Sequence, residues 1–355
     1  MNINKLSLKE KIGQKLLVGI NDYNIEIIID LIKNNYIGGV LLYKKNYHSY
    51  DEMLKVIKRL RDANSVNKIP LLIAIDQEGG VVNRFTSEIL NLKNIYDASK
   101  TDKKLISDIA NITSKVLSES GINMNLAPVL DIYNKSNSKA LYKRCFYGNE
   151  KNIYNDAKSY IKEFNATGII TVCKHFPGHG ATKRDSHFII PYIFNYKEII
   201  NKHVLPFKDA IHDNVDAIMV GHFVIRRLSP FLPTSISSKF INQYLRLECH
   251  YNGVVISDEI NMLSRNIIYK WHYLDHVFKS GTDIVLIKIK DRTNALRILK
   301  KAYRILMNDV RLDDSVMRII NLKNKYKLDD NAKINGINID DINKKISRIN
   351  DAINS

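Results

Sequence analysis

The chain contains little cysteine: only Cys145, Cys173 and Cys249 occur among its 355 residues. They are odd in number and far apart, so the sequence shows neither a disulfide framework nor a Cys-x-x-Cys metal-binding pair. This scarcity argues against a small disulfide-stabilised secreted domain and is typical of a protein that stays in a reducing compartment.

Long apolar segments are also absent. No stretch approaches the roughly 20 apolar residues that a membrane-spanning helix needs. The first eleven residues, Met-Asn-Ile-Asn-Lys-Leu-Ser-Leu-Lys-Glu-Lys, contain neither the continuous apolar run nor the small-residue cleavage site of a signal peptide. We therefore expect no membrane partner and a cytoplasmic location.

Acidic side chains are outnumbered, with 37 Asp and Glu against 54 Lys and Arg, which gives a net charge of +17. Such an excess can indicate a nucleic-acid partner, because clustered basic side chains neutralise phosphates. Here the lysines are scattered from Lys5 to Lys345, and no arginine-rich run alternates with aromatic residues. We interpret the charge as diffuse and expect no nucleic-acid partner.

Hydrophobic residues make up 45% of the chain, enough for a sizeable core, and many of them fall in short continuous runs. Such runs indicate strands that are buried on both faces, as in parallel sheets, because a strand with one exposed face alternates apolar and polar residues. The eight runs cover residues 16–20, 39–43, 71–75, 124–129, 169–173, 217–220, 254–257 and 283–287.

Longer amphipathic stretches separate the runs, for example at 50–63, 104–120 and 152–166, and each has the pattern of a helix with one apolar face. Eight strands that alternate with helices predict an α/β fold, a single (β/α)8 TIM-type barrel, over residues 1–327. A doubly wound open sheet is the alternative, because a strand count from sequence can be wrong by one or two. Residues 328–355 read as a polar, helical C-terminal extension.

Titratable residues follow several of the apolar runs. In a barrel of this kind the active site lies at the C-terminal ends of the strands. A single aspartate in such a position is more often a helix N-cap than a catalyst, but several polar groups at one face predict a polar pocket. The residues in question are Asp76, Asp131, Lys174, His175, His222 and Asp258.

The longest motif covers residues 173–187 and is too long for an ordinary strand-to-helix connection. Its histidines raise a metal site as an alternative, but Phe-Pro-Gly between His175 and His179 prevents the helix that would align the ligands. We therefore expect no metal and no other cofactor. Asp185 and His187 are interpreted as a pair in which the carboxylate orients the imidazole, so that His187 can act as general acid and base. A surface histidine beside a surface aspartate is the alternative.

Two shorter motifs also carry polar groups. Asp258 directly follows the seventh run, within Ser-Asp-Glu-Ile-Asn-Met, where it can serve as a nucleophile, a base or the N-cap of the next helix. In the segment 75–85 a Gly-Gly pair permits a sharp turn, and Asp76 and Arg84 offer hydrogen bonds to a polar ligand.

In order and spacing these segments resemble glycoside hydrolase family 3, in particular its compact bacterial β-N-acetylhexosaminidases. The 174–187 loop with its terminal Asp-Ser-His is the most specific part, because other branches of the family take their acid/base from an added C-terminal domain. The resemblance covers about Gly38 to Ile287 and includes Gly38-Gly39-Val40, Asn46-Tyr47-His48, the 76–85 segment, Leu126-Ala127-Pro128-Val129-Leu130-Asp131, the 174–187 loop, Ala217-Ile218-Met219 with His222, Ser257-Asp258, and Gly281 with Asp283.

The resemblance implies a retaining β-N-acetylglucosaminidase that releases terminal N-acetylglucosamine from cytoplasmic peptidoglycan fragments, N-acetylglucosaminyl-1,6-anhydro-muramyl compounds with or without peptide. Asp258 matches the nucleophile that forms a covalent glycosyl-enzyme, and His187 matches the acid/base, oriented by Asp185. The partner is then a small amino-sugar or muropeptide substrate, and we expect a monomer. The residues that match those holding the terminal sugar are Asp76, Arg84, Arg144, Lys174 and His175.

The sequence also departs from the family pattern. Val81 stands where an arginine is usual, Glu259 replaces a common aspartate, and Leu263-Ser264-Arg265 replaces a Glu-Gly-Ala-like stretch. Three alternatives stay open: a phosphorylase that transfers the sugar to phosphate, a β-glucosidase of the same family, and a non-catalytic sugar-binding barrel. The last is expected to lose Asp258 or His187, and both are present.

Overall fold

The computed structural model describes residues 3–20, 25–133, 139–182, 190–265 and 272–354. Each of the eight apolar runs contains at least one strand, and neighbouring strands pair in parallel. The strands are β1 (Leu16–Gly19), β2 (Gly39–Leu42), β3 (Leu72–Ile75), β4 (Met124–Asn125), β5 (Ile170–Thr171), β6 (Cys173–Phe176), β8 (Ala217–Val220), β10 (Val254–Ser257) and β11 (Val285–Lys288).

The strands close into a ring rather than an open sheet. One sheet runs in the order β11-β1-β2-β3-β4-β5, and the other in the order β10-β8-β6. The chain passes directly from β5 to β6, and a parallel bridge between Ile256 and Ile284 joins β10 to the start of β11. The predicted barrel is therefore confirmed, with β5 and β6 sharing the place of one strand.

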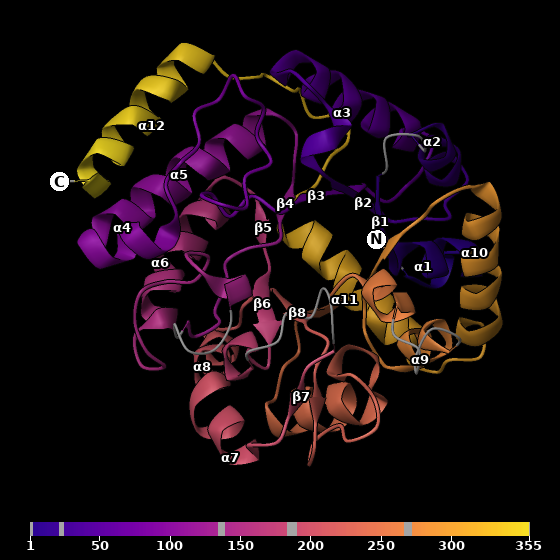
Figure 1. The fold of residues 1–355 in the computed structure, drawn as a ribbon. Coiled ribbons are helices and arrows are strands. Elements are labelled where there is room, and N and C mark those ends of the chain that lie inside the picture. The colour runs from indigo at the N-terminus through magenta and orange to yellow at the C-terminus, as the bar shows by residue number, and fades with distance from the viewer. Residues whose placement is uncertain (1–2, 21–24, 134–138, 183–189, 266–271, 355) are drawn as a thin grey trace.

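Helices surround the barrel, as Figure 1 shows. They are amphipathic, and side-chain caps begin several of them; Ser49, for example, accepts a hydrogen bond from the Glu52 N–H at the start of α3. Their bounds are α1 (Leu8–Gln14), α2 (Ile25–Lys33), α3 (Tyr50–Asn64), α4 (Ile95–Thr101), α5 (Lys104–Glu119), α6 (Ile153–Ala166), α7 (Tyr196–Glu198), α8 (Leu205–His212), α9 (Tyr273–Lys279), α10 (Arg292–Leu306), α11 (Leu312–Lys325) and α12 (Ile339–Asn354).

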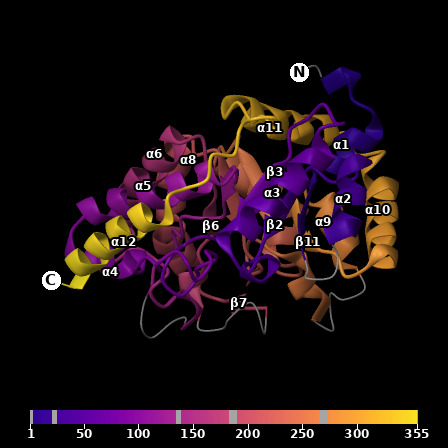
Figure 2. The same ribbon diagram turned by 90° about the horizontal axis from the view of Figure 1, so that it is seen from above.

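Helix α11 closes the N-terminal end of the barrel. Its Ile319 and Leu322 belong to the apolar cluster that fills the barrel interior. Figure 2 shows α11 across one end of the molecule, while the short strand β7 (Tyr192–Ile193), which pairs with β9 (Val224–Ile225), lies at the other. The C-terminal ends of the strands thus remain available for a site.

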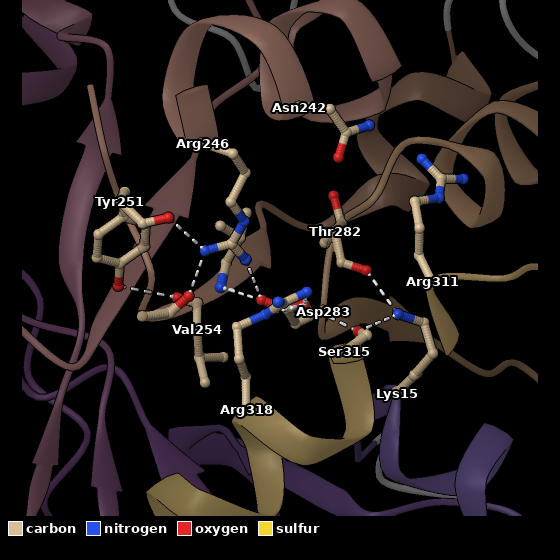
Figure 3. A network of polar contacts seen from close by, with 12 residues as sticks. Lys15, Asn242, Arg246, Tyr251, Val254, Thr282, Asp283, Arg311, Ser315 and Arg318 are labelled. Atoms are coloured by element: carbon tan, nitrogen blue, oxygen red, sulfur yellow. Dashed lines mark hydrogen bonds and ion pairs between the residues drawn. The ribbon is translucent and has the colours of Figure 1, made fainter. Parts of the chain in front are cut away.

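A buried carboxylate organises the same closed end of the barrel (Figure 3). Asp283, just before β11, accepts hydrogen bonds from the side chains of Arg246, Arg318 and Ser315 and from the Val255 N–H. Lys15, just before β1, donates to Ser315 Oγ at 2.6 Å. Burial would raise the pKa of the Asp283 carboxyl, but the surrounding cations outweigh burial and lower that pKa. This network ties α11 to the starts of two strands.

The polar C-terminal extension contains helix α12, as the sequence predicted, and the helix is packed rather than loose. Ile342, Ile346, Ile349 and Ile353 form a buried stripe, and α12 contacts α5 and α4 (Figure 1). Among the described residues, no helix has the length and apolar character to cross a membrane.

Candidate active site

A cavity of about 420 Å³ lies at the C-terminal ends of the barrel strands, a volume within the range of small-molecule sites. Strand ends supply most of its polar walls, because the carboxyl ends of parallel strands meet at one face of a barrel. The cavity brings together six of the predicted site residues: Asp76, Arg84, Arg144, Lys174, His175 and Asp258.

Lys174, on β6, lies between two carboxylates. Its Nζ is 2.8 Å from Asp76 Oδ1 and 2.7 Å from Glu78 Oε1. Its side chain is only 3% exposed, and such deep burial would lower the pKa of the ammonium group. Asp76 and Glu78 outweigh burial and raise that pKa, so Lys174 stays charged and can donate to a ligand oxygen.

Arg144 lies in a loop 66 residues after Glu78 and binds the Glu78 carboxylate. Its Nε and Nη2 atoms donate to Glu78 Oε2 and Oε1 at 2.8 and 2.9 Å, in a bidentate pair. Burial would raise the pKa of the Glu78 carboxyl, but Arg144 and Lys174 hold it well below its usual range. Glu78 is therefore a fixed anion that holds two cavity cations in place.

His175 is oriented by a buried aspartate. Its Nδ1 lies 2.7 Å from Asp131 Oδ2, and Asp131 also accepts from the backbone N–H groups of His175 and His179. Burial would raise the pKa of Asp131, but His175 and the hydrogen bonds lower it. The hydrogen bond from Nδ1 to Asp131 fixes the orientation of the imidazole in the cavity that His175 lines.

Asp258 follows β10 directly and lines the cavity. The Asp258 N–H donates to Val220 O at 3.0 Å, and its Oδ1 accepts from the Glu259 N–H at 2.7 Å. The neighbouring Glu259, one of the departures from the family pattern, also lines the cavity, and its Oε2 is 2.5 Å from Lys288 Nζ. Position 259 thus forms an ion pair in the cavity wall that is separate from the ion pairs of Asp76 and Glu78.

Arg84 lines the cavity and follows a tight turn at Gly79 and Gly80. Gly79 and Gly80 have φ angles of 84° and 57°, which glycine adopts without strain. The Arg84 N–H donates to Gln77 Oε1 at 2.7 Å, and Tyr47 donates to Arg84 O at 2.9 Å. Val81, another departure, is 67% exposed at this turn and lies outside the cavity wall.

Two predicted residues, Asp185 and His187, lie outside the described residues, as do 183–189 generally. His222, which the strand-end pattern also singled out, is buried and does not line the cavity; its ring bonds Ser235 Oγ and the backbone oxygen of Glu259, a cavity residue. Over residues 3–20, 25–133, 139–182, 190–265 and 272–354, no group of three or more His, Cys, Asp or Glu side chains is arranged to hold a metal ion.

Sequence reasoning missed Glu78 and Lys288 as site residues and gave Asp131 no role. Both acidic residues have a signal in the sequence: Asp131 follows the fourth apolar run, and Glu78 lies two residues after Asp76. Nothing in the sequence predicted that Glu78 pairs with Arg144 and Lys174, or that Asp131 bonds His175. Lys288 ends β11, so the strand-end rule that selected Lys174 would also have selected it.

Known proteins are similar to this chain over most of its length. The model of the glycosyl hydrolase family 3 N-terminal domain matches residues 7–322. A β-hexosaminidase of Photobacterium profundum is 31% identical over 277 residues, which cover 76% of this chain and 80% of that protein. A β-hexosaminidase of Vibrio cholerae is 30% identical over 274 residues, with the same two shares.

A solved structure is similar over almost the full length. The family 3 β-N-acetylglucosaminidase of a Paenibacillus species superposes with a TM-score of 0.87 at 28% identity, covering 98% of this chain and 69% of that one. The family match, the two bacterial relatives and this superposition agree with the resemblance drawn from the motifs. The chain belongs to glycoside hydrolase family 3.

Proposed function

We propose that this glycoside hydrolase is a retaining β-N-acetylglucosaminidase that releases terminal N-acetylglucosamine from fragments of the cell wall. The single observation that carries the proposal is that Asp258 lines the same cavity as the ion-paired residues Asp76, Glu78, Arg144 and Lys174. The relatives named β-hexosaminidase, and the similar structure named β-N-acetylglucosaminidase, support the choice of an amino sugar.

The cavity divides into a binding side and a reacting side. Asp76, Arg84, Arg144, Lys174 and His175 supply acceptors and fixed donors for the hydroxyl and acetamido groups of the terminal sugar. Because the donors are held by Glu78 and Asp131 before substrate arrives, little reorganisation is needed when the sugar binds.

The proposed reaction follows the two steps of a retaining glycosidase. The Asp258 carboxylate attacks the anomeric carbon while the bond to the leaving oxygen breaks, and His187, oriented by Asp185, gives that oxygen its proton. Water then attacks the glycosyl-enzyme, His187 takes its proton, and the Asp258 carboxylate leaves. The sugar departs with its original anomeric configuration.

For the compartment we propose the cytoplasm. All three cysteines, Cys145, Cys173 and Cys249, are buried and unpaired with one another. Free thiols of this kind are typical of a reducing environment. The substrates would then be wall fragments that have entered the cell.

The proposal is tested by comparing an aryl β-N-acetylglucosaminide with the matching β-glucoside. We expect kcat/KM to favour the amino sugar by about 10⁴-fold, because a site built to bond the acetamido group leaves buried donors unpaired with glucose. Nuclear magnetic resonance of the first product should show retained configuration. Equal kcat/KM for the two sugars would make the enzyme a β-glucosidase, and a requirement for phosphate would make it a phosphorylase.

Replacing Glu78 with glutamine tests the binding side. The variant keeps the shape but removes the charge that holds Arg144 and Lys174, so we expect kcat/KM to fall by roughly 10²-fold, the cost of a misplacement of about 1 Å. Glu248→Gln, an exposed glutamate elsewhere, is the matched control. A folded Glu78→Gln enzyme with unchanged kcat/KM contradicts the role given to Glu78.

A further inference from the structure

Helix α12 presents two asparagines beside its buried stripe. Asn343 and Asn350 are seven residues apart, close to two helical turns, so both project on the same side of the helix. The isoleucines at 342, 346, 349 and 353 anchor that side against α5 and α4. Both asparagines lie outside residues 7–322, the part that the family model matches.

Each asparagine bonds one backbone N–H and one backbone C=O of the segment 88–93. Asn343 Oδ1 accepts from the Leu90 N–H at 2.8 Å, and its Nδ2 donates to Glu88 O at 2.8 Å. Asn350 repeats the pattern, accepting from the Lys93 N–H at 2.9 Å and donating to Asn91 O at 3.0 Å. A side-chain amide carries both groups, so each asparagine pairs with the segment as a neighbouring strand would.

The segment 88–93 also forms hydrogen bonds with the Gly79–Gly80 turn. Asn91 Nδ2 donates to Gly80 O at 2.8 Å, and the Gly80 N–H donates to Leu92 O at 2.8 Å. The approach is close: a Cβ at position 80 would come within 2.6 Å of Asn94 Cβ. Any displacement of the segment is therefore passed to the turn.

The turn leads directly into the cavity wall. The N–H groups of Glu78 and Gly79 donate to Val82 O at 3.1 and 3.2 Å, which fixes the path of the chain between Glu78 and Arg84. Glu78, Val82 and Arg84 all line the cavity. A continuous series of hydrogen bonds therefore connects α12 to the sugar-binding side of the cavity. Four bonds join α12 to the segment 88–93, two join that segment to the Gly79–Gly80 turn, and two lie within the turn.

We propose that Asn343 and Asn350 are positioning residues for the terminal-sugar subsite. They hold the segment 88–93, the segment holds the Gly79–Gly80 turn, and the turn sets the positions of Glu78 and Arg84. The part of this inference that concerns the sugar rests on the proposed function. The part that concerns the turn stands on the hydrogen bonds alone.

The test uses the full-length Asn343→Ala/Asn350→Ala double variant. Ser347→Ala/Asn354→Ala, which alters two exposed positions of the same helix, is the matched control. We expect KM for the aryl β-N-acetylglucosaminide to rise roughly 10-fold to 100-fold, the range of a misplacement of up to about 1 Å. We expect kcat to change little, because the binding lost is shared by ground and transition states. Asp258 follows β10, whereas α12 packs mainly against α5 and α4.

Amide hydrogen exchange supplies a readout that needs no activity. The Leu90 and Lys93 amides lose their acceptors in the variant by construction. The Gly80 amide keeps Leu92 O as its acceptor, so its exchange should quicken only when the turn has loosened. The single variants Asn343→Ala and Asn350→Ala give the same comparison should the double variant fail to fold.

The outcomes are distinct. A raised KM and faster Gly80 exchange, with the control unchanged, support the inference. A lower melting temperature with unchanged KM and unchanged Gly80 exchange overturns it and leaves α12 a purely structural helix. A wild-type enzyme inactive on the amino sugar refutes the proposed function, and the Gly80 exchange then decides the positioning role alone.

Discussion

Replacement of Asp258 with alanine is expected to abolish turnover while the barrel stays folded. In the proposed reaction this carboxylate forms the covalent intermediate, and removing a nucleophile of that kind lowers kcat on the order of 10⁴–10⁶-fold. Asp258 follows β10 directly and lines the cavity, so its side chain is not part of the hydrophobic core. Unfolding in urea should therefore change little.

A 2-fluoro aryl glycoside should trap the intermediate, and peptide mapping should find the label on Asp258. Glu259→Gln is the matched control, since Glu259 lines the same cavity and is paired with Lys288. A label on Glu259 would reassign the nucleophile. A label on Glu78 would contradict the site as a whole, because its oxygens are bonded to Arg144 and Lys174.

Replacement of Asp283 with asparagine is expected to lower the free energy of unfolding strongly. The change leaves Lys15, Arg246 and Arg318 partly or fully buried without their shared carboxylate. Removing one partner of a buried ion pair costs roughly 3–5 kcal/mol of unfolding free energy. Urea unfolding at neutral pH measures the loss, with Ser315→Ala as a control that removes the hydrogen bonds to Lys15 and Asp283 but no charge.

The loss should depend on pH with a definite sign. The folded state lowers the pKa of Asp283, so its carboxylate stabilises the fold above the unfolded value of about 4. That stabilisation is lost as the pH falls through the lowered folded pKa. The difference between wild type and variant should be constant from neutral pH down to about 5 and shrink in stronger acid. A difference below about 1 kcal/mol at neutral pH would show that the network is dispensable.

The fold could be predicted because its strands are short and buried on both faces. Runs such as 39–43 and 71–75 are apolar throughout for that reason, and eight of them gave the barrel. The same rule predicted part of the site. Asp76 and Asp258 directly follow β3 and β10. Lys174 directly follows the apolar run 169–173 but is the second residue of β6 in the structure, and all three residues line the cavity.

Arg144 shows where the strand-end rule fails. It lies in a loop far from any strand end, so only the family resemblance singled it out. Its partner Glu78 is 66 residues away, and nothing local to either residue predicts their contact. The assignment of Asp185 and His187 stays a prediction, since both lie outside the described residues.

The sequence by itself determined the class of fold, the face that carries the site and the polar residues Asp76, Lys174 and Asp258 that line it, because these follow from local periodicity and from the ends of the apolar runs. Only the tertiary structure decided which charges pair and which helix holds which loop. Asn343 bonds Leu90 across 253 positions, and Lys15 bonds Thr282 across 267. Such contacts depend on how the barrel closes and how its helices pack against it. The residues around an asparagine or a lysine in the sequence are the same whichever distant group its side chain binds, so they do not predict the partner.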